Sequence, residues 1–157
     1  MAYSRQEIVQ QHDHYSKFSE RWQYFIRSYL GGEEYKEGRY LQEYNLELES
    51  ELYKRLQFTP LDNHCRNIVH IYSSFLFRVK PVRELGNLEQ DKTVPMFLDD
   101  ADLEGRSYEA LLQELQSYAS IYGHCWLVLD KPNSNARTRA EELQQEIRPY
   151  VNIYTPE

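Results

Sequence analysis

The chain has fewer basic than acidic side chains and lacks long apolar runs, and both features argue against particular classes of protein. Lys and Arg number 18 against 25 Asp and Glu, which leaves a net charge of −7 over 157 residues. This balance argues against a general basic surface that would bind nucleic acid through counterion release. No run of about 18 apolar residues occurs and the first residues lack a signal-peptide pattern, so we expect neither a membrane span nor secretion, and a cytoplasmic location.

Cysteine is scarce as well, with only Cys65 and Cys125 in the whole chain. Two isolated cysteines without a CxxC motif favour reduced, structural thiols over a disulfide framework. Each follows a histidine, His64 or His124, which raises the possibility of a thiol activated by a base. A thiolate nucleophile needs its base across space, and both cysteines fall on faces that the apolar pattern predicts to be buried, so we favour the structural interpretation.

The motifs of common enzyme sites are also missing. Gly31-Gly32 is not followed by the GK[ST] of a phosphate-binding loop, and no GxGxxG occurs, so nucleotide hydrolysis is not expected. His12-Asp13-His14 offers two imidazoles and a carboxylate, but adjacent residues of a helix point to different sides. Glu47 and Glu51 are one helical turn apart, which is more typical of a solvated charged face than of an acid–base pair. We therefore predict no catalytic, cofactor-binding or metal-binding residues, and no enzyme.

Tyrosine, by contrast, is abundant, with 14 residues. A side chain with an apolar ring and a polar tip suits half-buried faces and subunit contacts. The aromatic residues of the first third would also suit the stacking of single-stranded bases, yet base-stacking proteins combine aromatics with a basic groove and this stretch is rich in acids. Packing and subunit contact explain the set better: Trp22, Tyr24, Tyr29, Tyr35, Tyr40 and Tyr44.

The first half of the chain is predicted to be helical. Apolar residues spaced by three and four between Phe18 and Tyr29 form one helical face, and Gly31-Gly32 ends that helix. Residues 33–39 lack an apolar period and predict a loop. A second helix is predicted from Leu41 to Leu56, with Glu51 four residues before Arg55 and able to pair with it.

The third helix has a clear predicted start, because Thr59 is a suitable cap and Pro60 fits the first helical position. Its apolar face is wide enough to pack against more than one neighbour, so we predict the core helix of the fold. A polar connector follows from Glu84 to Gly105, with a short apolar island in it. The predicted core face comprises Leu61, Cys65, Ile68, Val69, Tyr72, Phe75 and Leu76.

The last third alternates helices and strands. Ser107 is predicted to cap a helix that Gly123 ends, and the apolar run from His124 to Asp130 predicts a buried strand. A helix over 136–147 leads to a half-buried strand, Tyr150–Tyr154, and this order fits either a βαβ unit or a hairpin with a helical insertion. The fold class is therefore predicted as α+β, mostly helical, with helices packed on a small sheet. Its divisions are a helical part (1–80), a connector (81–106) and a helix–strand–helix–strand part (107–157).

Several of these pieces, in this order, resemble the N-terminal region of the portal proteins of tailed bacteriophages. The resemblance covers nearly the whole chain. Its motifs are Trp22 with Arg27-Ser-Tyr-Leu-Gly-Gly32, Tyr40-Leu41 leading through Glu51 to Arg55, Thr59-Pro-Leu-Asp-Asn-His-Cys-Arg-Asn-Ile-Val69, Phe75-Leu-Phe77, Tyr122-Gly123 with the strand to Asp130-Lys-Pro132, and Arg148-Pro-Tyr150 leading to Tyr154-Thr-Pro-Glu157.

The resemblance implies a structural role in the virion. Portal proteins form a ring, usually twelve-fold, at one vertex of the capsid, where double-stranded DNA passes during packaging and ejection and where the head joins the tail. The partners implied are other copies of the chain, the major capsid protein, the packaging terminase and head–tail adaptors. Assembly would take place in the host cytoplasm, and this segment would belong to the wing, the peripheral α/β layer of the ring.

Portal proteins are longer than this chain, so we expect a front segment, incomplete at its C-terminus, with channel-lining and motor-docking residues beyond Glu157. The apolar runs Cys125–Leu129 and Val151–Ile153 also need further strands beside them to make a stable sheet. Two other hypotheses remain open: a small acidic adaptor or scaffold protein that binds a portal or capsid without entering the ring, and a metal-dependent hydrolase that uses His12, His14, Glu47 or His64.

Overall fold

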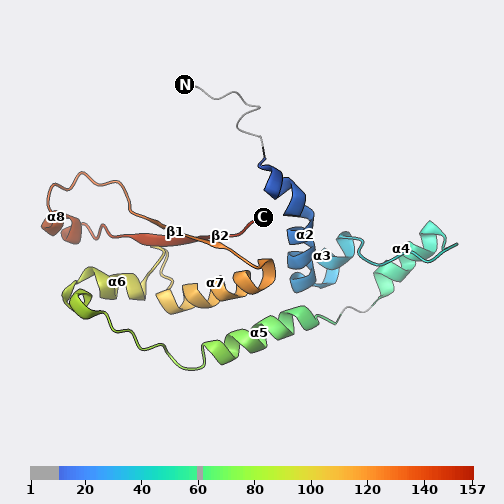
Figure 1. Cartoon of the computed structure of the whole chain (residues 1–157), viewed down its shortest axis with the longest axis horizontal. Coiled ribbons are helices and arrows are strands. Elements are labelled where there is room, and N and C mark those ends of the chain that lie inside the picture. The colour runs from blue at the N-terminus through green and yellow to red at the C-terminus, as the bar shows by residue number, and fades with distance from the viewer. Residues whose placement is uncertain (1–10, 60–61) are drawn as a thin grey trace, which may run out of the picture. The chain divides into compact units, whose positions relative to one another are not determined.

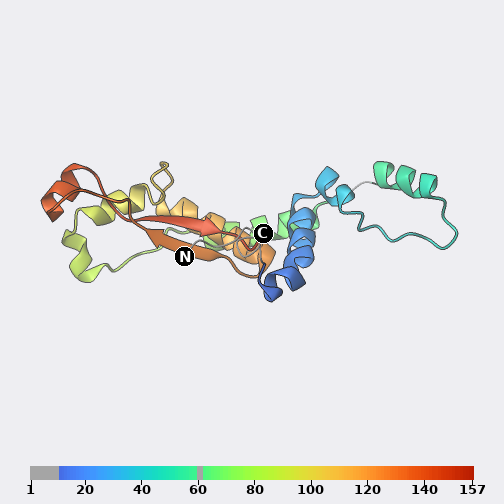
Figure 2. The same ribbon diagram turned by 90° about the horizontal axis from the view of Figure 1, so that it is seen from above.

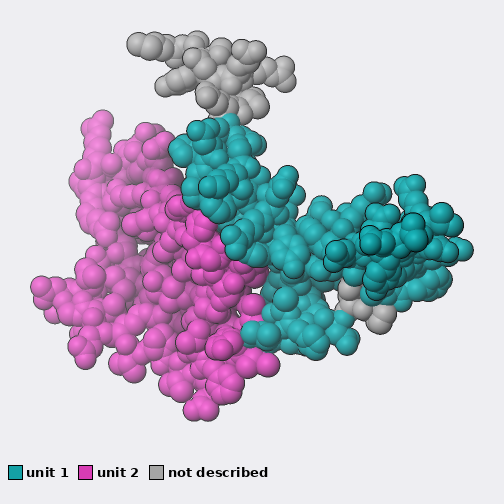
Figure 3. Space-filling model, turned by 45° about the vertical axis from the view of Figure 1, so that its right-hand side comes forward, with its two compact units in different colours: residues 1–68, 156–157 teal, residues 69–155 magenta. Residues whose placement is uncertain are grey.

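The computed structural model describes residues 11–59 and 62–157, which form two compact units (Figure 3). Unit 1 holds the described residues up to Ile68 together with 156–157, and unit 2 holds Val69–Thr155. The fold is α+β and mostly helical, with one small antiparallel sheet, which confirms the predicted class. The predicted start of the third helix at Pro60, and Leu61 on its core face, lie outside the described residues.

Unit 1 begins with the helix that the aromatic spacing predicts, α2 (Asp13–Leu30). Its first turn is capped by the His12 imidazole, whose Nδ1 accepts a hydrogen bond from the His14 amide at 3.1 Å. Gly31 ends the helix with φ +67°, and its amide donates to the Arg27 carbonyl. A side chain at Gly31 would also meet the Asn63 amide group, so both conformation and space favour glycine here.

The next segments correct two predictions. Residues 33–39 are not a loop throughout, because α3 (Gly32–Glu37) forms there, with Glu33 and Glu34 at its positively polarised N-terminus. The following helix, α4 (Glu49–Phe58), begins eight residues later than Leu41. The intervening stretch is irregular, and Leu46 has φ +69°, a left-handed conformation that does not occur inside a right-handed α-helix.

α5 (His64–Leu76) spans the border between the units. Thr59, predicted to cap it, instead ends α4, because its amide and its hydroxyl both donate to the Arg55 carbonyl. Asn63 does the capping: its Oδ1 accepts from the Arg66 amide at 2.8 Å. The apolar side of α5 is exposed, so the prediction of a core helix is wrong, and Cys65 is exposed with it.

The predicted connector of unit 2 contains regular structure. A 3₁₀ helix, η1 (Gly86–Gln90), and α6 (Thr93–Asp99) occupy it, and Ala101 after them is fully buried. The prediction of a polar connector is therefore wrong for this stretch. The apolar island is too short for its sequence pattern alone to indicate a helix. In the structure Phe97 of α6 packs against Tyr108, with ring centroids 5.4 Å apart, and this tertiary contact holds α6 in unit 2.

α7 (Tyr108–Tyr122) has the predicted boundaries. The Ser107 hydroxyl accepts from the Ala110 amide at 3.3 Å, and Gly123 ends the helix in the left-handed conformation with φ +85°. Beyond it, β1 (Trp126–Asp130), α8 (Arg139–Gln144) and β2 (Tyr150–Tyr154) follow in the predicted order, although α8 is shorter than 136–147.

β1 and β2 pair in antiparallel register, with Trp126 opposite Tyr154 and Leu129 opposite Val151. Of the two predicted topologies, the hairpin with a helical insertion is therefore the correct one, and α8 lies in the long connection between the strands (Figure 1). On the other side of β2, the Val151 amide donates to the Ala101 carbonyl at 2.8 Å. Ala101 thus borders one edge of β2, and β1 borders the other.

The core of unit 2 is small and lies between α7 and β2. Ala101, Leu111 and Val151 are buried there, and Phe97, Tyr108 and Ile153 pack around them. Figures 1 and 2 show the sheet lying along α7 in both views. The predicted burial of β1 is wrong, because all five of its residues are exposed. α7 packs against β2 and does not extend over β1, so β1 remains exposed.

Candidate interaction surface

The residues of α5 that belong to unit 2 turn their polar side to α7. Ser73 is buried, and His70, Ser73 and Ser74 line a hollow of about 420 Å³ together with Gln113 and Ser117 of α7. An amphipathic helix normally packs its apolar side on the protein. In unit 2, α5 instead turns its polar side to the protein.

The apolar side of the same stretch is exposed to solvent. Ile71, Tyr72, Phe75 and Leu76, which we name the α5 outer face, are each more than half exposed. Their spacing places them on one side of the helix. A contiguous apolar patch of this kind is typical of a surface that binds a partner.

An ion pair holds the segment after α5 against the start of α7. Arg83 Nη1 lies 2.5 Å from Glu109 Oε1, and the Arg83 guanidinium lies over the Tyr108 ring, 5.1 Å from its centroid. The hydrogen bond from Arg83 lowers the pKa of Glu109, which favours its charged form. These contacts tie residue 83, seven positions after Leu76, to α7, and no sequence motif pointed to them.

A second exposed apolar surface belongs to β1. Leu127 and Leu129 lie directly opposite Ile153 and Val151 in the register, so all four side chains point to the side of the sheet that α7 covers. Val151 is buried, whereas Leu127 and Leu129 are 45% and 67% exposed. We name these two leucines the β1 face. Within the described residues β1 pairs with β2 alone, so the outer edge of β1 is also open.

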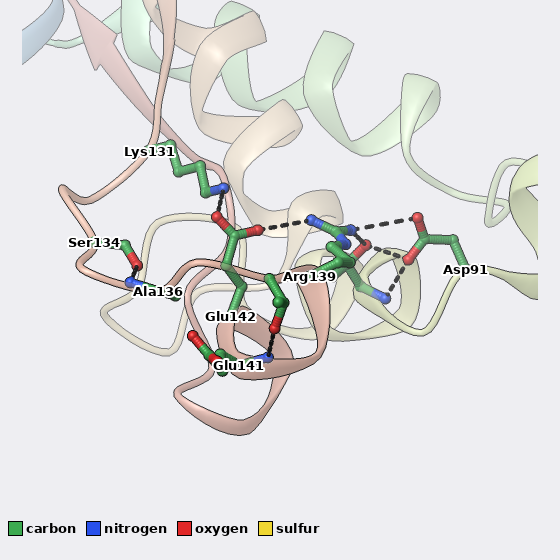
Figure 4. Close-up of polar contacts among 9 residues, drawn as sticks. Asp91, Lys131, Ser134, Ala136, Arg139, Glu141 and Glu142 are labelled. Carbon is green, nitrogen blue, oxygen red and sulfur yellow. Dashed lines mark hydrogen bonds and ion pairs between the residues drawn. The ribbon is translucent and has the colours of Figure 1, made fainter.

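The helical insertion between the strands is fastened by charged side chains (Figure 4). Arg139 reaches Asp91 Oδ2 at 3.5 Å, Thr93 Oγ1 at 3.1 Å and Glu142 Oε2 at 3.4 Å. Lys131 Nζ lies 2.5 Å from Glu142 Oε1, and this hydrogen bond is the main cause that lowers the pKa of Glu142. Cations and carboxylates are matched in this network, so it serves to position α8.

The charged residues beside β2 are matched in the same way. A hollow of about 270 Å³ is lined by residues 102–106, α7 and β2, and inside it Arg106 pairs with both Asp102 and Glu114. Arg148, which is buried, lies 2.5 Å from Asp100 Oδ2. The Arg148–Asp100 pair holds the chain that precedes β2 against the stretch that borders its edge, and the Arg106–Glu114 pair joins that stretch to α7.

The predicted thiol–base candidates are not brought together. Cys65 and its neighbour His64 are exposed, so the predicted burial of Cys65 is wrong. The Cys125 thiol lies 3.6 Å from the Leu115 carbonyl and donates to it, and burial raises the pKa of Cys125. The His124 ring stands edge-on to Trp126 at 4.9 Å. A thiol with a raised pKa is the reverse of an activated nucleophile.

The two candidate carboxylates do separate tasks. Glu47 precedes α4 and accepts two hydrogen bonds from the Arg55 guanidinium, at 2.9 and 2.7 Å. Glu51 lies in the first turn of α4 and accepts from the Leu48 amide, so the predicted Glu51–Arg55 pair is replaced by Glu47–Arg55. The hydrogen bond from Arg55 lowers the pKa of Glu47, which therefore stays ionised near neutral pH.

The aromatic side chains of unit 1 contact one another and nearby cations. Tyr24, Tyr35 and Tyr40 form a cluster in which Tyr24 meets Tyr40 edge-on at 4.7 Å. The Arg55 guanidinium lies 4.3 Å from the centroid of the Tyr44 ring, and Trp22 is buried. Burial is the main cause that raises the pKa of Tyr35. This arrangement is typical of packing and leaves no row of parallel rings for bases.

Across residues 11–59 and 62–157, no group of three or more His, Cys, Asp and Glu side chains lies close enough to hold a metal ion. In the same residues no helix is long and apolar enough to cross a membrane. No protein-family model matches the chain, and no curated protein matches it. The α5 outer face and the β1 face are two exposed apolar surfaces of unit 2.

Proposed function

We propose that this chain is a structural subunit of a phage portal ring, in the wing-type N-terminal region that its motifs resemble. The observation that carries the proposal is the pair of exposed apolar surfaces in unit 2, the α5 outer face and the β1 face. A subunit of a ring is stable in its assembly, where neighbouring copies cover such surfaces.

The polar residues support a structural role. The carboxylates Glu47, Glu109 and Glu142 are each paired with a cation, and the pKa of each is lowered. Groups that work as general acids at neutral pH have raised pKa values instead. In this proposal the chain is no enzyme, and its place is the virion, at one capsid vertex.

The proposed partners are those of a portal ring: other copies of the chain, most often twelve in total, the major capsid protein, the packaging terminase and head–tail adaptors. Double-stranded DNA would pass through the ring. The net charge of −7 fits a segment that does not itself hold the DNA.

Electron microscopy of the full-length gene product, with rotational classification and intact mass, tests this proposal. We expect closed rings in the micrographs of the purified protein or of the native particle. A protein that stays monomeric across concentration, without rings, would contradict the proposal. Binding of one or a few copies to a ring made of another protein would favour the adaptor hypothesis, because stoichiometry separates the two roles.

A further inference from the structure

Unit 2 contains a helix face without a sheet and a sheet face without a helix. The α5 outer face consists of apolar side chains on one side of a helix, which is the surface that packs on a sheet. The β1 face consists of two leucines that continue the core-facing side of β2 beyond the reach of α7. The uncovered helix face could therefore pack on the uncovered sheet face.

The segment that carries the α5 outer face differs in charge from the rest of the chain. Residues 63–83 contain Arg66, Arg78, Lys80 and Arg83 and no Asp or Glu, which is a charge of +4. Because the whole chain carries −7, removing this +4 leaves −11 on the remaining residues. Arg78 and Lys80 follow directly after α5, whereas β1 ends in Asp130. Arg83 is paired with Glu109 of its own copy, so Arg78 and Lys80 are the cations beside the α5 outer face that would meet the acidic remainder of a second copy.

We propose that the α5 outer face of one copy of this chain packs against the β1 face of a second copy, beside that copy's α7. The inference rests on the proposed function, because it names the two surfaces by which one subunit of the ring would meet the next. The contact is head-to-tail: each copy offers its helix to one neighbour and its strand to the other. In each interface, the second helix completes the layer that α7 begins.

The alternatives within the same chain are less favourable. Pairing of two α5 outer faces would bring Arg78 and Lys80 of one copy close to Arg78 and Lys80 of the other, and like charges in an interface oppose association. Pairing of two β1 edges would satisfy backbone groups but would leave Tyr72 and Phe75 exposed in both copies. Only the contact between helix and strand covers both surfaces.

Mixed cysteine variants test which surfaces meet. In a Cys65→Ser, Cys125→Ala background, one sample carries Tyr72→Cys and the other Leu129→Cys, both at exposed positions, and a short bismaleimide joins thiols in the mixture. We expect the 72–129 product to exceed the 72–72 and 129–129 products at least about tenfold. Leu88→Cys is the matched control, because Leu88 is an exposed leucine of unit 2 outside both surfaces. Equal yields from like pairs, or with Leu88→Cys, would overturn the inference.

Sedimentation equilibrium of the whole chain tests the same contact without a reagent. Phe75→Glu should weaken self-association at least about tenfold, since a charge would enter an apolar contact. Phe58→Glu, also an exposed phenylalanine on a helix, should leave association unchanged. Association should also weaken between about 50 mM and about 0.5 M salt, because screening reduces attraction between opposite charges. Equal effects of both variants, or association that rises with salt, would contradict the inference, and so would a chain that is monomeric at every concentration.

A monomeric protein would contradict both proposals, and two other outcomes separate them. Rings that form without the 72–129 product would overturn this contact and leave the portal proposal in place. The 72–129 product in a protein that forms open fibres or short oligomers would uphold the contact and contradict the ring.

Discussion

Two residues that act on their own backbone define the ends of α7. Ser107 and Gly123 bound α7 as the sequence indicated, because a cap and a left-handed stop depend on neighbours within four positions. Arg55 was predicted to pair with Glu51 and pairs with Glu47 instead. That choice depends on a chain reversal before α4, which spacing along a helix does not express.

The most buried leucine supplies the first prediction at this scale. Leu111 is 1% exposed in the core of unit 2, so Leu111→Ala should lower the free energy of unfolding by about 3 kcal/mol through lost burial and a cavity. Urea unfolding followed by circular dichroism measures the change. Leu88→Ala, at an exposed position, is the control and should have little effect; equal losses would mean that the core lies elsewhere.

The Glu47–Arg55 pair supplies a prediction of pH dependence. The hydrogen bond from Arg55 lowers the pKa of Glu47 from the usual 4.5, so the ionised form stabilises the folded state above that pH. This contribution is lost as the pH falls below 4.5 through the folded-state pKa. Glu47→Gln should therefore reduce the free energy of unfolding at neutral pH. The variant should also lose less stability than the unchanged protein as the pH falls below 4.5.

Thermal unfolding between about pH 3 and about pH 7 measures this dependence. The control is Glu84→Gln, which removes an exposed carboxylate that lies outside the helices and strands. An acid transition of Glu47→Gln that matches the unchanged protein would show that the pair contributes nothing to it.

At the scale of elements, the sequence predicted α7 correctly, whereas for α5 it predicted the wrong cap and the wrong buried side. The period of α5 correctly indicated an amphipathic helix, and its apolar side was assigned to the core. In the structure the serine side faces α7 instead. Periodicity identifies the two sides of a helix, but it does not say whether the apolar side meets the same chain or another one.

The cap of α7 gives a prediction for an element. Ser107→Ala removes the hydroxyl that accepts from the Ala110 amide, and it should lower stability by about 1 kcal/mol. Ser50→Ala is the control, because Ser50 lies inside α4 and is not the residue that caps it. Chemical unfolding of both variants decides the matter; a Ser107→Ala protein as stable as the parent would mean that the cap contributes nothing.

At the scale of the whole molecule, the exposed apolar surfaces connect stability with association. If copies cover the α5 outer face and the β1 face, only the folded assembly gains that burial. The midpoint of thermal unfolding should therefore rise with protein concentration, by several degrees over a hundredfold range.

Differential scanning fluorimetry across that range is the measurement, and Phe75→Glu provides the comparison because it should remove most of the dependence. A midpoint that is constant with concentration in the unchanged protein would contradict coupling between folding and association.

The sequence by itself determined the class of fold, the C-terminal end of α2, both ends of α7, the order of the last four elements and the position of β2. These features follow from side-chain periodicity and from caps and glycines that act within a few residues. Only the tertiary structure decided that β1 and β2 are antiparallel, that Asp91 and Arg139 fasten the insertion, and that α5 and β1 stay uncovered. Strand pairing and burial depend on residues distant in the sequence, and a pattern of apolar residues specifies that a surface will be covered without specifying what covers it.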